Sequence, residues 1–278
     1  MKFVTFATGD TSHAGVLTGE DIIDLTAAGL AASVQDLIAG GADALAKVRA
    51  VDGPKIPVGS VRLRAPLLNP GKILCSGVNF KDHAAEGSGK VPEEPFFFAK
   101  LPSSVAGPED RIVASPMSSQ IDYEVEFAVV IGKRLSRARP EEVMPAIFGY
   151  TMLNDISARD VQFKDNQITL GKNFEHFAPI GPCIVTADEM TRPDQVRIMT
   201  RLNGKTMQDG NTEDWIFPLP QFISFLSQVM PLEPGDIVST GTPAGVGWGH
   251  KPQVFMKPGD VIEIEGEGIG ILRNYIVA

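Results

Sequence analysis

The sequence predicts a β-rich α+β fold. Its 278 residues include 28 glycines and 21 prolines, a composition that favours many turns and short strands. The apolar segments are irregularly spaced and lack the regular alternation of strand and helix that a doubly wound parallel sheet requires. The hydrophobic content of 43% is ordinary for a globular enzyme. This length predicts one large domain, or one domain with a small extension.

Residues 1–65 are predicted to form a small N-terminal α+β domain. Strands are expected at 2–7 and 14–17, joined by a turn at Gly9-Asp10, and at 22–25. Short helices are expected at 33–38 and 42–48, on either side of Gly40-Gly41. No motif in this unit has a chemical role, so we expect it to support packing or a dimer.

Residues 70–278 are predicted to form the catalytic domain, after a junction marked by Pro66, Pro70 and Gly71. The expected strands are 73–78, 123–131, 147–153, 184–186, 196–202, 236–240 and 261–265. A helix is expected at 221–228, where apolar residues recur at helical spacing. Pro-Gly-Asp turns precede the last two strands, at 234–236 and 258–260.

Charge and composition exclude several classes of partner. The net charge is −9 and no lysine or arginine cluster is present, which argues against nucleic acid and against an anionic membrane surface. No apolar stretch approaches the roughly 20 residues that span a bilayer. The first residues lack an apolar signal region, so the cytoplasm is the expected location. Cys75 and Cys183 match no metal or redox spacing and are expected to be buried, reduced thiols.

The stretch Asp122-Tyr123-Glu124-Val125-Glu126 carries the strongest chemical signal. On a strand these three carboxylates would share one face, and the apolar run that follows indicates a buried strand. Buried, mutually repelling carboxylates are costly, and a divalent cation would offset both costs. A solvated, acidic strand end explains the stretch equally well at this point.

Asp155 adds a further acidic position, directly after the apolar run 148–153. It could act as the N-cap of a short helix beginning at Ile156. Together with Glu124 and Glu126 it would instead complete a set of oxygen ligands. Such a set suits Mg²⁺, Mn²⁺ or Ca²⁺ rather than zinc or copper.

His83 and Glu86 are spaced as neighbours on one helical turn. A carboxylate beside an imidazole orients it and raises its basicity, which suits a general base. The following Gly87-Ser88-Gly89 is expected to let the segment close as a lid. The alternative is a surface turn with a weak ion pair.

Further polar candidates follow Asp155 in the chain. Lys172, after Gly171, could stabilise an oxyanion, and Gln162 could donate to the same oxyanion. The glycine-rich loop 240–247 could hold a carboxylate through its backbone N–H groups, including that of Gly241, and through the Thr242 hydroxyl. It is neither a Walker A loop nor a dinucleotide fingerprint, and a plain tight turn is its alternative interpretation.

These motifs, in this order, resemble the fumarylacetoacetate hydrolase (FAH) superfamily. The segments that carry the resemblance are 122–126, 154–160, 171–172, 207–212, 234–237, 240–247 and 264–274. The resemblance implies a mixed β-sandwich roll, often assembled as a homodimer, and a metal-dependent enzyme acting on short oxo acids. It implies Mg²⁺ or Mn²⁺ held by Glu124, Glu126 and Asp155, while Asp122 need not touch the metal.

The resemblance also assigns the remaining roles. It implies His83 and Glu86 as the catalytic pair, Lys172 and Gln162 as oxyanion donors, and Thr242 as the residue that binds substrate. We therefore predict a C–C hydrolase of a 2,4-dioxo acid of the acylpyruvate type, in the catabolism of aromatic compounds or small acids. His83 would activate the attacking water, and the cleaved bond would leave an enolate stabilised by the metal.

The same site supports other reactions of related acids. An oxaloacetate decarboxylase and an isomerase of a 2-hydroxy-dienedioate are the alternatives, and a non-catalytic module that binds small acids is a third hypothesis. The sequence departs from the commoner family pattern at 172–177 and in the glycine-rich segment 86–91. Both departures lie where the shape of the substrate would be recognised, so the sequence does not define the substrate.

Overall fold

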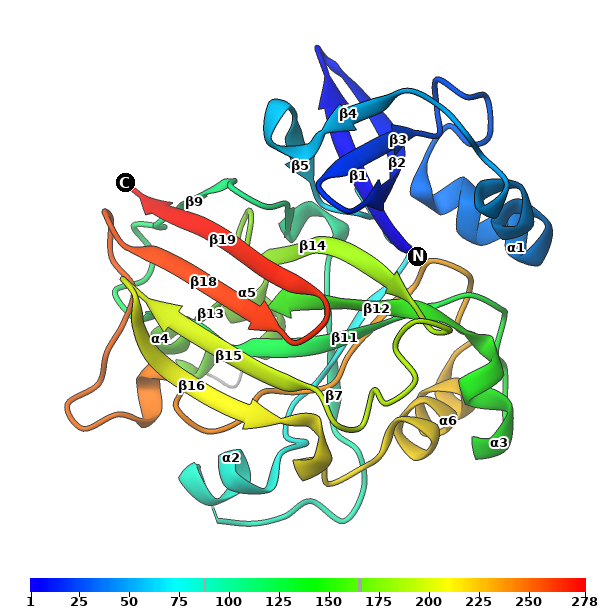
Figure 1. The fold of residues 1–278 in the computed structure, drawn as a ribbon. Helices are drawn as coiled ribbons and strands as arrows, with labels where there is room; N and C mark the ends of the chain where they lie inside the picture. The colour runs from blue at the N-terminus through cyan, green and yellow to red at the C-terminus, as the bar shows by residue number, and fades with distance from the viewer. Residues whose placement is uncertain (88, 165–166) are drawn as a thin grey trace.

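The computed structural model describes residues 1–87, 89–164 and 167–278, and most of its elements belong to three sheets (Figure 1). The main path of the largest sheet runs in the order β4 (Lys55–Pro57), β3 (Asp21–Asp24), β2 (Thr11–Thr18), β1 (Lys2–Thr8), β14 (Ala178–Thr186), β12 (Ile147–Asn154), β11 (Val125–Ile131), β17 (Ile237–Ser239), β6 (Ile73–Ser76) and β7 (Phe97–Lys100). Beside this path, β5 (Arg62–Arg64) pairs with β1, and β8 (Val105–Ala106) pairs with β14.

A second sheet has five strands, in the order β16 (Lys205–Asn211), β15 (Arg197–Leu202), β18 (Val261–Gly266), β19 (Gly270–Val277) and β9 (Arg111–Val113). A short pair joins β10 (Ile121–Asp122) to β13 (Ser157–Ala158). Most neighbouring strands are antiparallel, but β17 with β6, β14 with β8 and β19 with β9 are parallel. The sheets are therefore mixed, in agreement with the predicted β-rich fold.

The helices are few and mostly short. They are α1 (Val34–Arg49), α2 (Lys81–Glu86), α3 (Pro140–Val143), α4 (Arg159–Gln162), α5 (Ile168–Lys172) and α6 (Leu219–Val229). Within the described ranges, no helix is long and apolar enough to cross a bilayer. The two helices predicted between residues 33 and 48 are confirmed, because α1 is interrupted at Gly41, whose φ of 58° and ψ of −142° are not helical.

The five-stranded sheet packs against one face of the larger sheet, in front of β11, β12 and β14 in Figure 1. Phe127 and Val129 of β11 belong to the buried cluster between the layers, together with Ile264 of β18. Gly266 permits this close approach, because a Cβ atom there would lie 2.3 Å from the Met152 sulfur. Ala128 and Val130, on the other face of β11, join a second buried cluster. Burial of β11 on both faces confirms that the strand is internal.

The acidic stretch does not form one continuous strand. The prediction of a strand over 123–131 is wrong at its start, because Tyr123 and Glu124 separate β10 from β11. There the Tyr123 N–H donates to the Asp122 carboxylate (2.8 Å), and the Glu124 N–H donates to the Asn154 side chain (3.1 Å). These side-chain acceptors replace a strand ladder. Asp122 therefore lies on a separate short strand instead of sharing a strand face with Glu124.

Candidate metal centre and active site

Strand pairing brings Glu124, Glu126 and Asp155 together. Glu124 and Glu126 flank Val125, which is the register partner of Asn154 at the end of β12. Asp155 follows immediately, and its N–H donates to the Glu124 carbonyl at 3.0 Å. The ligand atoms of the three carboxylates lie within 4.8 Å of one another, and all three residues are buried. A buried set of oxygen donors fits a hard divalent cation.

The alternative role for Asp155, as the cap of a helix beginning at Ile156, is wrong. Residues after Asp155 form β13, and α4 begins only at Arg159, with Ala158 in the N-cap position. The Asp155 carboxylate instead meets two buried ammonium groups. Lys100 lies 2.6 Å from one of its oxygens and Lys172 lies 2.7 Å from the other.

Glu124 and Glu126 differ in the charged side chains that surround them. Glu124 pairs with Lys172 (2.8 Å) and with Arg159 (2.6 Å). Burial raises the pKa of Glu124, but these two cations outweigh burial and hold its pKa well below the usual range. Among the residues that the structure describes, Glu126 forms no ion pair and accepts a bond from the Gly241 N–H at 3.2 Å. Burial, reinforced by the charges of Asp155 and Glu124, raises the pKa of Glu126 well above its usual value.

His83 and Glu86 form the predicted pair on α2. The Nδ1 atom of His83 lies 3.1 Å from Oε2 of Glu86, while Oε1 accepts from the Gly245 N–H at 3.0 Å. Burial raises the pKa of Glu86, but the bonds from His83 and Gly245 outweigh burial and lower it. An ionised Glu86 can only accept, so Nδ1 of His83 carries a hydrogen, which in a neutral ring leaves the lone pair on Nε2. Ser88 of the predicted lid lies outside the described residues.

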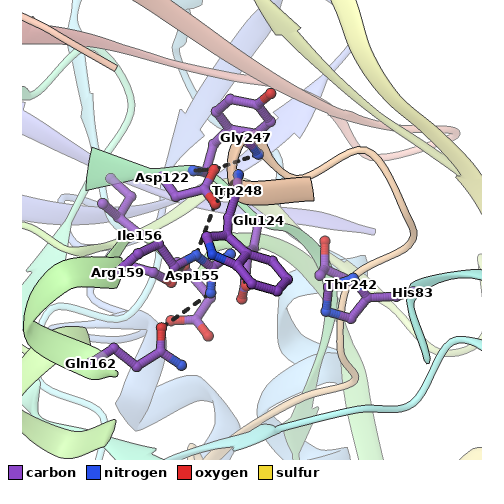
Figure 2. A network of polar contacts seen from close by, with 12 residues as sticks. His83, Asp122, Glu124, Asp155, Ile156, Arg159, Gln162, Thr242, Gly247 and Trp248 are labelled. Atoms are coloured by element: carbon purple, nitrogen blue, oxygen red, sulfur yellow. Dashed lines mark hydrogen bonds and ion pairs between the residues drawn. The ribbon is translucent and has the colours of Figure 1, made fainter. Parts of the chain in front are cut away.

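A cavity of about 200 Å³ is lined both by His83 of this pair and by Glu124 of the acidic centre. His83, Glu124, Gln162 and Lys172 all line it, and so does Arg159. Its remaining wall is largely apolar, with contributions from Phe96, Phe98, Phe163, Val246 and Trp248. Figure 2 shows Arg159 between Asp122 and Gln162. Because Oε1 of Gln162 accepts from Arg159 at 3.1 Å, its amide N–H groups remain available as donors.

Gly241 and Thr242 belong to the loop after β17, and Gly241 contacts the acidic centre. The Gly241 N–H reaches Glu126, and the positive φ of Gly241 (91°) is a conformation that favours glycine. Thr242 is 3% exposed and is not among the described residues that line the cavity. Its hydroxyl oxygen accepts a bond from the side chain of Gln208 at 2.8 Å.

Asp122 is engaged elsewhere, as Figure 2 also shows. Its carboxylate accepts from the Gly247 N–H at 2.6 Å, from the Trp248 N–H at 2.9 Å and from Arg159 at 2.8 Å. It therefore fixes the loop after β17 and the Arg159 guanidinium, and it is not part of the three-carboxylate group.

The prediction from sequence missed Arg159, Lys100 and Gln208 as members of the site. Arg159 lies within the quoted segment 154–160, and Gln208 lies within 207–212. Lys100 could have been found, because it ends the apolar run that begins at Phe96. A lysine in a buried strand needs a partner of opposite charge or a hydrogen-bond acceptor.

The family model described as "Fumarylacetoacetate (FAA) hydrolase C-terminal" matches residues 72–277. The chain belongs to this family. It is 40% identical to the protein named "Oxaloacetate tautomerase FAHD2A, mitochondrial" from Bos taurus over 274 residues, which cover 95% of this chain and 87% of that protein. The family's enzymes share the strand-rich mixed sheets described above.

Solved structures of family members superpose over the whole chain. A fumarylacetoacetate hydrolase from Exiguobacterium antarcticum has a TM-score of 0.88 and 36% identity, covering 100% of this chain and 99% of its own. A maleylpyruvate hydrolase from Sphingobium sp. SYK-6, in complex with manganese(II) and pyruvate, has a TM-score of 0.81 and 29% identity, with the same coverage of the two chains. These similarities extend the match to the N-terminal residues that the family model leaves out.

Proposed function

We propose that this protein is a metal-dependent enzyme that interconverts the keto and enol forms of a short 2-oxo dicarboxylic acid such as oxaloacetate. The observation that carries the proposal is the small cavity that His83 lines together with Glu124, Gln162 and Lys172. The similarity to an oxaloacetate tautomerase over almost the whole chain supports the same reaction. This proposal favours one of the related reactions of oxo acids over the hydrolysis expected from the sequence.

The size and charge of the cavity suit a small dianion. Its volume of about 200 Å³ is below the range of roughly 300–1,000 Å³ that is typical of sites for drug-sized ligands. Lys90, Arg159 and Lys172 contribute three cationic side chains to its lining, against the single carboxylate of Glu124. Burial favours the neutral amine of Lys172, but Asp155 and Glu124 outweigh burial and raise its pKa, so Lys172 stays an ammonium.

We assign the proton transfer to His83. Its Nε2 lone pair would take a proton from C3 of the keto acid and return it to the oxygen on C2, so that no atom is gained or lost. Glu86 holds the ring in the required tautomer through Nδ1. Lys172 and the amide of Gln162 would donate to the C2 oxygen as negative charge develops there.

Glu124, Glu126 and Asp155 would hold the cation, and the donor set suits Mg²⁺ or Mn²⁺. A bound cation supplies Lewis-acid polarisation of the 2-oxo group. The manganese complex of the maleylpyruvate hydrolase supports a divalent ion in a protein of this fold.

Hydrolysis of an acylpyruvate is the second candidate function. It is favoured by the similarity to the maleylpyruvate hydrolase and by a His–Glu pair that could activate water. Tautomerisation needs only the transfer of a proton, whereas hydrolysis also breaks a C–C bond.

The test measures keto–enol conversion and C–C bond cleavage in one series of assays. Enol oxaloacetate is monitored by its ultraviolet absorbance with Mg²⁺, while pyruvate is measured with lactate dehydrogenase. We expect accelerated loss of the enol without matching pyruvate, and loss of the acceleration in His83→Asn and with chelator. Stoichiometric pyruvate would establish a decarboxylase, and cleavage of acylpyruvates with no effect on oxaloacetate would establish the hydrolase.

A further inference from the structure

Gln208 of β16 is a buried amide whose hydrogen-bonding groups are all engaged. It is 1% exposed. Its Oε1 accepts from the Val125 N–H (3.0 Å) and from the Thr200 hydroxyl (2.8 Å). Its Nε2 donates to the Thr242 hydroxyl oxygen and to the Pro243 carbonyl, both at 2.8 Å. We infer that Gln208 is a positioning residue that makes the Thr242 hydroxyl a donor to the substrate carboxylate, an inference that rests on the proposed function.

The orientation of the amide is determined by its partners. The Val125 N–H can only donate, so the atom facing it is the oxygen of Gln208. The Pro243 carbonyl can only accept, so the atom facing it is the nitrogen. These opposite requirements fix which atom reaches Thr242, and it is an N–H donor.

The consequence concerns the Thr242 hydrogen. Because the Thr242 oxygen accepts from Gln208, its own O–H is left to donate to another acceptor. A carboxylate is a strong acceptor for such a hydrogen. Without the donor from Gln208, this bond would no longer fix the orientation of the Thr242 hydroxyl.

Gln208 also bonds to two segments that border the metal centre, the residues around Val125 and the loop that carries Thr242. Val125 lies between Glu124 and Glu126, while Thr242 follows Gly241, whose N–H reaches Glu126. One side chain from the second sheet therefore bonds both to Val125, which lies between two of the proposed ligands, and to the loop that carries Thr242.

The loop rests directly on β16, which supports this role. A Cβ atom at Gly245 would lie 2.2 Å from the Met207 carbonyl oxygen, and one at Gly210 would lie 2.5 Å from the Pro243 side chain. The loop approaches the backbone of β16 closely at both points, so the position of the loop depends on β16.

The experiment compares Gln208→Glu with Thr242→Val and with the double variant. Glutamate keeps the oxygen that faces Val125 and Thr200 but loses the amide donors. We expect the KM for oxaloacetate, and the Kd for oxalate with Mn²⁺, to rise about 10-fold in each single variant, with little change in kcat. In the Thr242→Val background, Gln208→Glu should add no more than about 2-fold, because both changes remove the same contact.

Thr200→Val is the matched control. It removes another buried hydroxyl partner of the same amide but leaves the bond to Thr242. It should change KM by less than about 2-fold. Equal KM in Gln208→Glu and wild type, or fully additive effects in the double variant, would overturn the inference while leaving the proposed function standing. A wild-type protein that neither binds oxalate nor converts oxaloacetate would overturn both.

Discussion

At the scale of single residues, the three proposed ligands differ in the charges that already face them. Glu124 and Asp155 are each paired with two buried cations, whereas Glu126 has a backbone N–H as its partner. A cation entering the centre would therefore gain most from Glu126, because no ion pair among the described residues competes for that carboxylate. Neutralising Glu126 removes this gain and leaves the shape of the site almost unchanged.

We predict that Glu126→Gln lowers the affinity for Mn²⁺ by more than about 100-fold, beyond the loss that substitutions around metal ligands usually cause. Titration calorimetry measures this directly, and Glu20→Gln, the same change at an exposed position, should bind as wild type does. The thermal stabilisation of the wild type by Mn²⁺ should also disappear in Glu126→Gln. Undiminished Mn²⁺ binding by this variant would remove the proposed centre.

Glu86 gives a prediction about pH. Its pKa in the folded protein is below the ordinary value of about 4.3, so its ionised form stabilises the fold. That contribution is fully present above the ordinary pKa and is lost as the pH falls through the lower, folded value. Glu86→Gln should therefore reduce the free energy of unfolding at pH 6, and the difference from wild type should shrink below about pH 4. Urea unfolding at several pH values tests this, and a difference independent of pH would contradict it.

At the scale of elements, α2 is held to the loop after β17 by acidic side chains at both ends. Asp82 accepts from the Ala244 N–H at 3.1 Å, and Glu86 accepts from the Gly245 N–H at 3.0 Å. The helix has only six residues, so it depends on such tertiary bonds more than on its own propensity. These bonds keep His83 against the cavity.

We predict that Asp82→Ala loosens this attachment. Amide hydrogen exchange in α2 and at Ala244 should accelerate about 5-fold to 10-fold, as expected for loss of one hydrogen bond. The KM should rise while the metal affinity stays as in wild type, because no ligand is touched. Lys81→Ala, an exposed neighbour on the same helix, is the control. Unchanged exchange in Asp82→Ala would mean that packing alone holds the helix.

How far the sequence predicted these elements depends on how local their signals are. The strand over 147–153 and the helix over 221–228 have strong apolar patterns, and the structure confirms both. The strands β16 and β19 were missed, because their sequences mix polar and apolar residues and only pairing with neighbours makes them strands. The break at Tyr123 could not be predicted either, since it depends on Asn154, about thirty residues away.

In the site, too, the residues with a local sequence signal were predicted and those that depend on tertiary contacts were not. The motif spacing predicted Glu124, Glu126 and Asp155, and the structure brings them together. Lys100, Arg159 and Gln208 were missed because a buried ion pair or amide is created by the tertiary fold. Lys100 and Asp155, for example, are 55 residues apart in the chain.

At the scale of the whole molecule, the larger sheet runs without a break from the N-terminal strands into the catalytic region. Lys2 and Phe3 of β1 pair with Val185 and Ile184 of β14. Phe3 is fully buried, and its ring lies 5.7 Å from that of Phe148. Deleting the N-terminal strands would leave β14 as an unpaired edge beside an exposed apolar face, which is a surface prone to aggregation.

We predict that residues 70–278 alone melt at least about 5 °C below the full chain and aggregate, because this edge and face lose their cover. Size-exclusion chromatography and thermal melting measure both effects. Phe3→Ala in the full chain isolates the packing contribution and should cost about 3–5 kcal/mol of the free energy of unfolding. A monodisperse fragment with the melting temperature of the full chain would show that residues 1–65 are an independent domain which the catalytic region does not need for its stability.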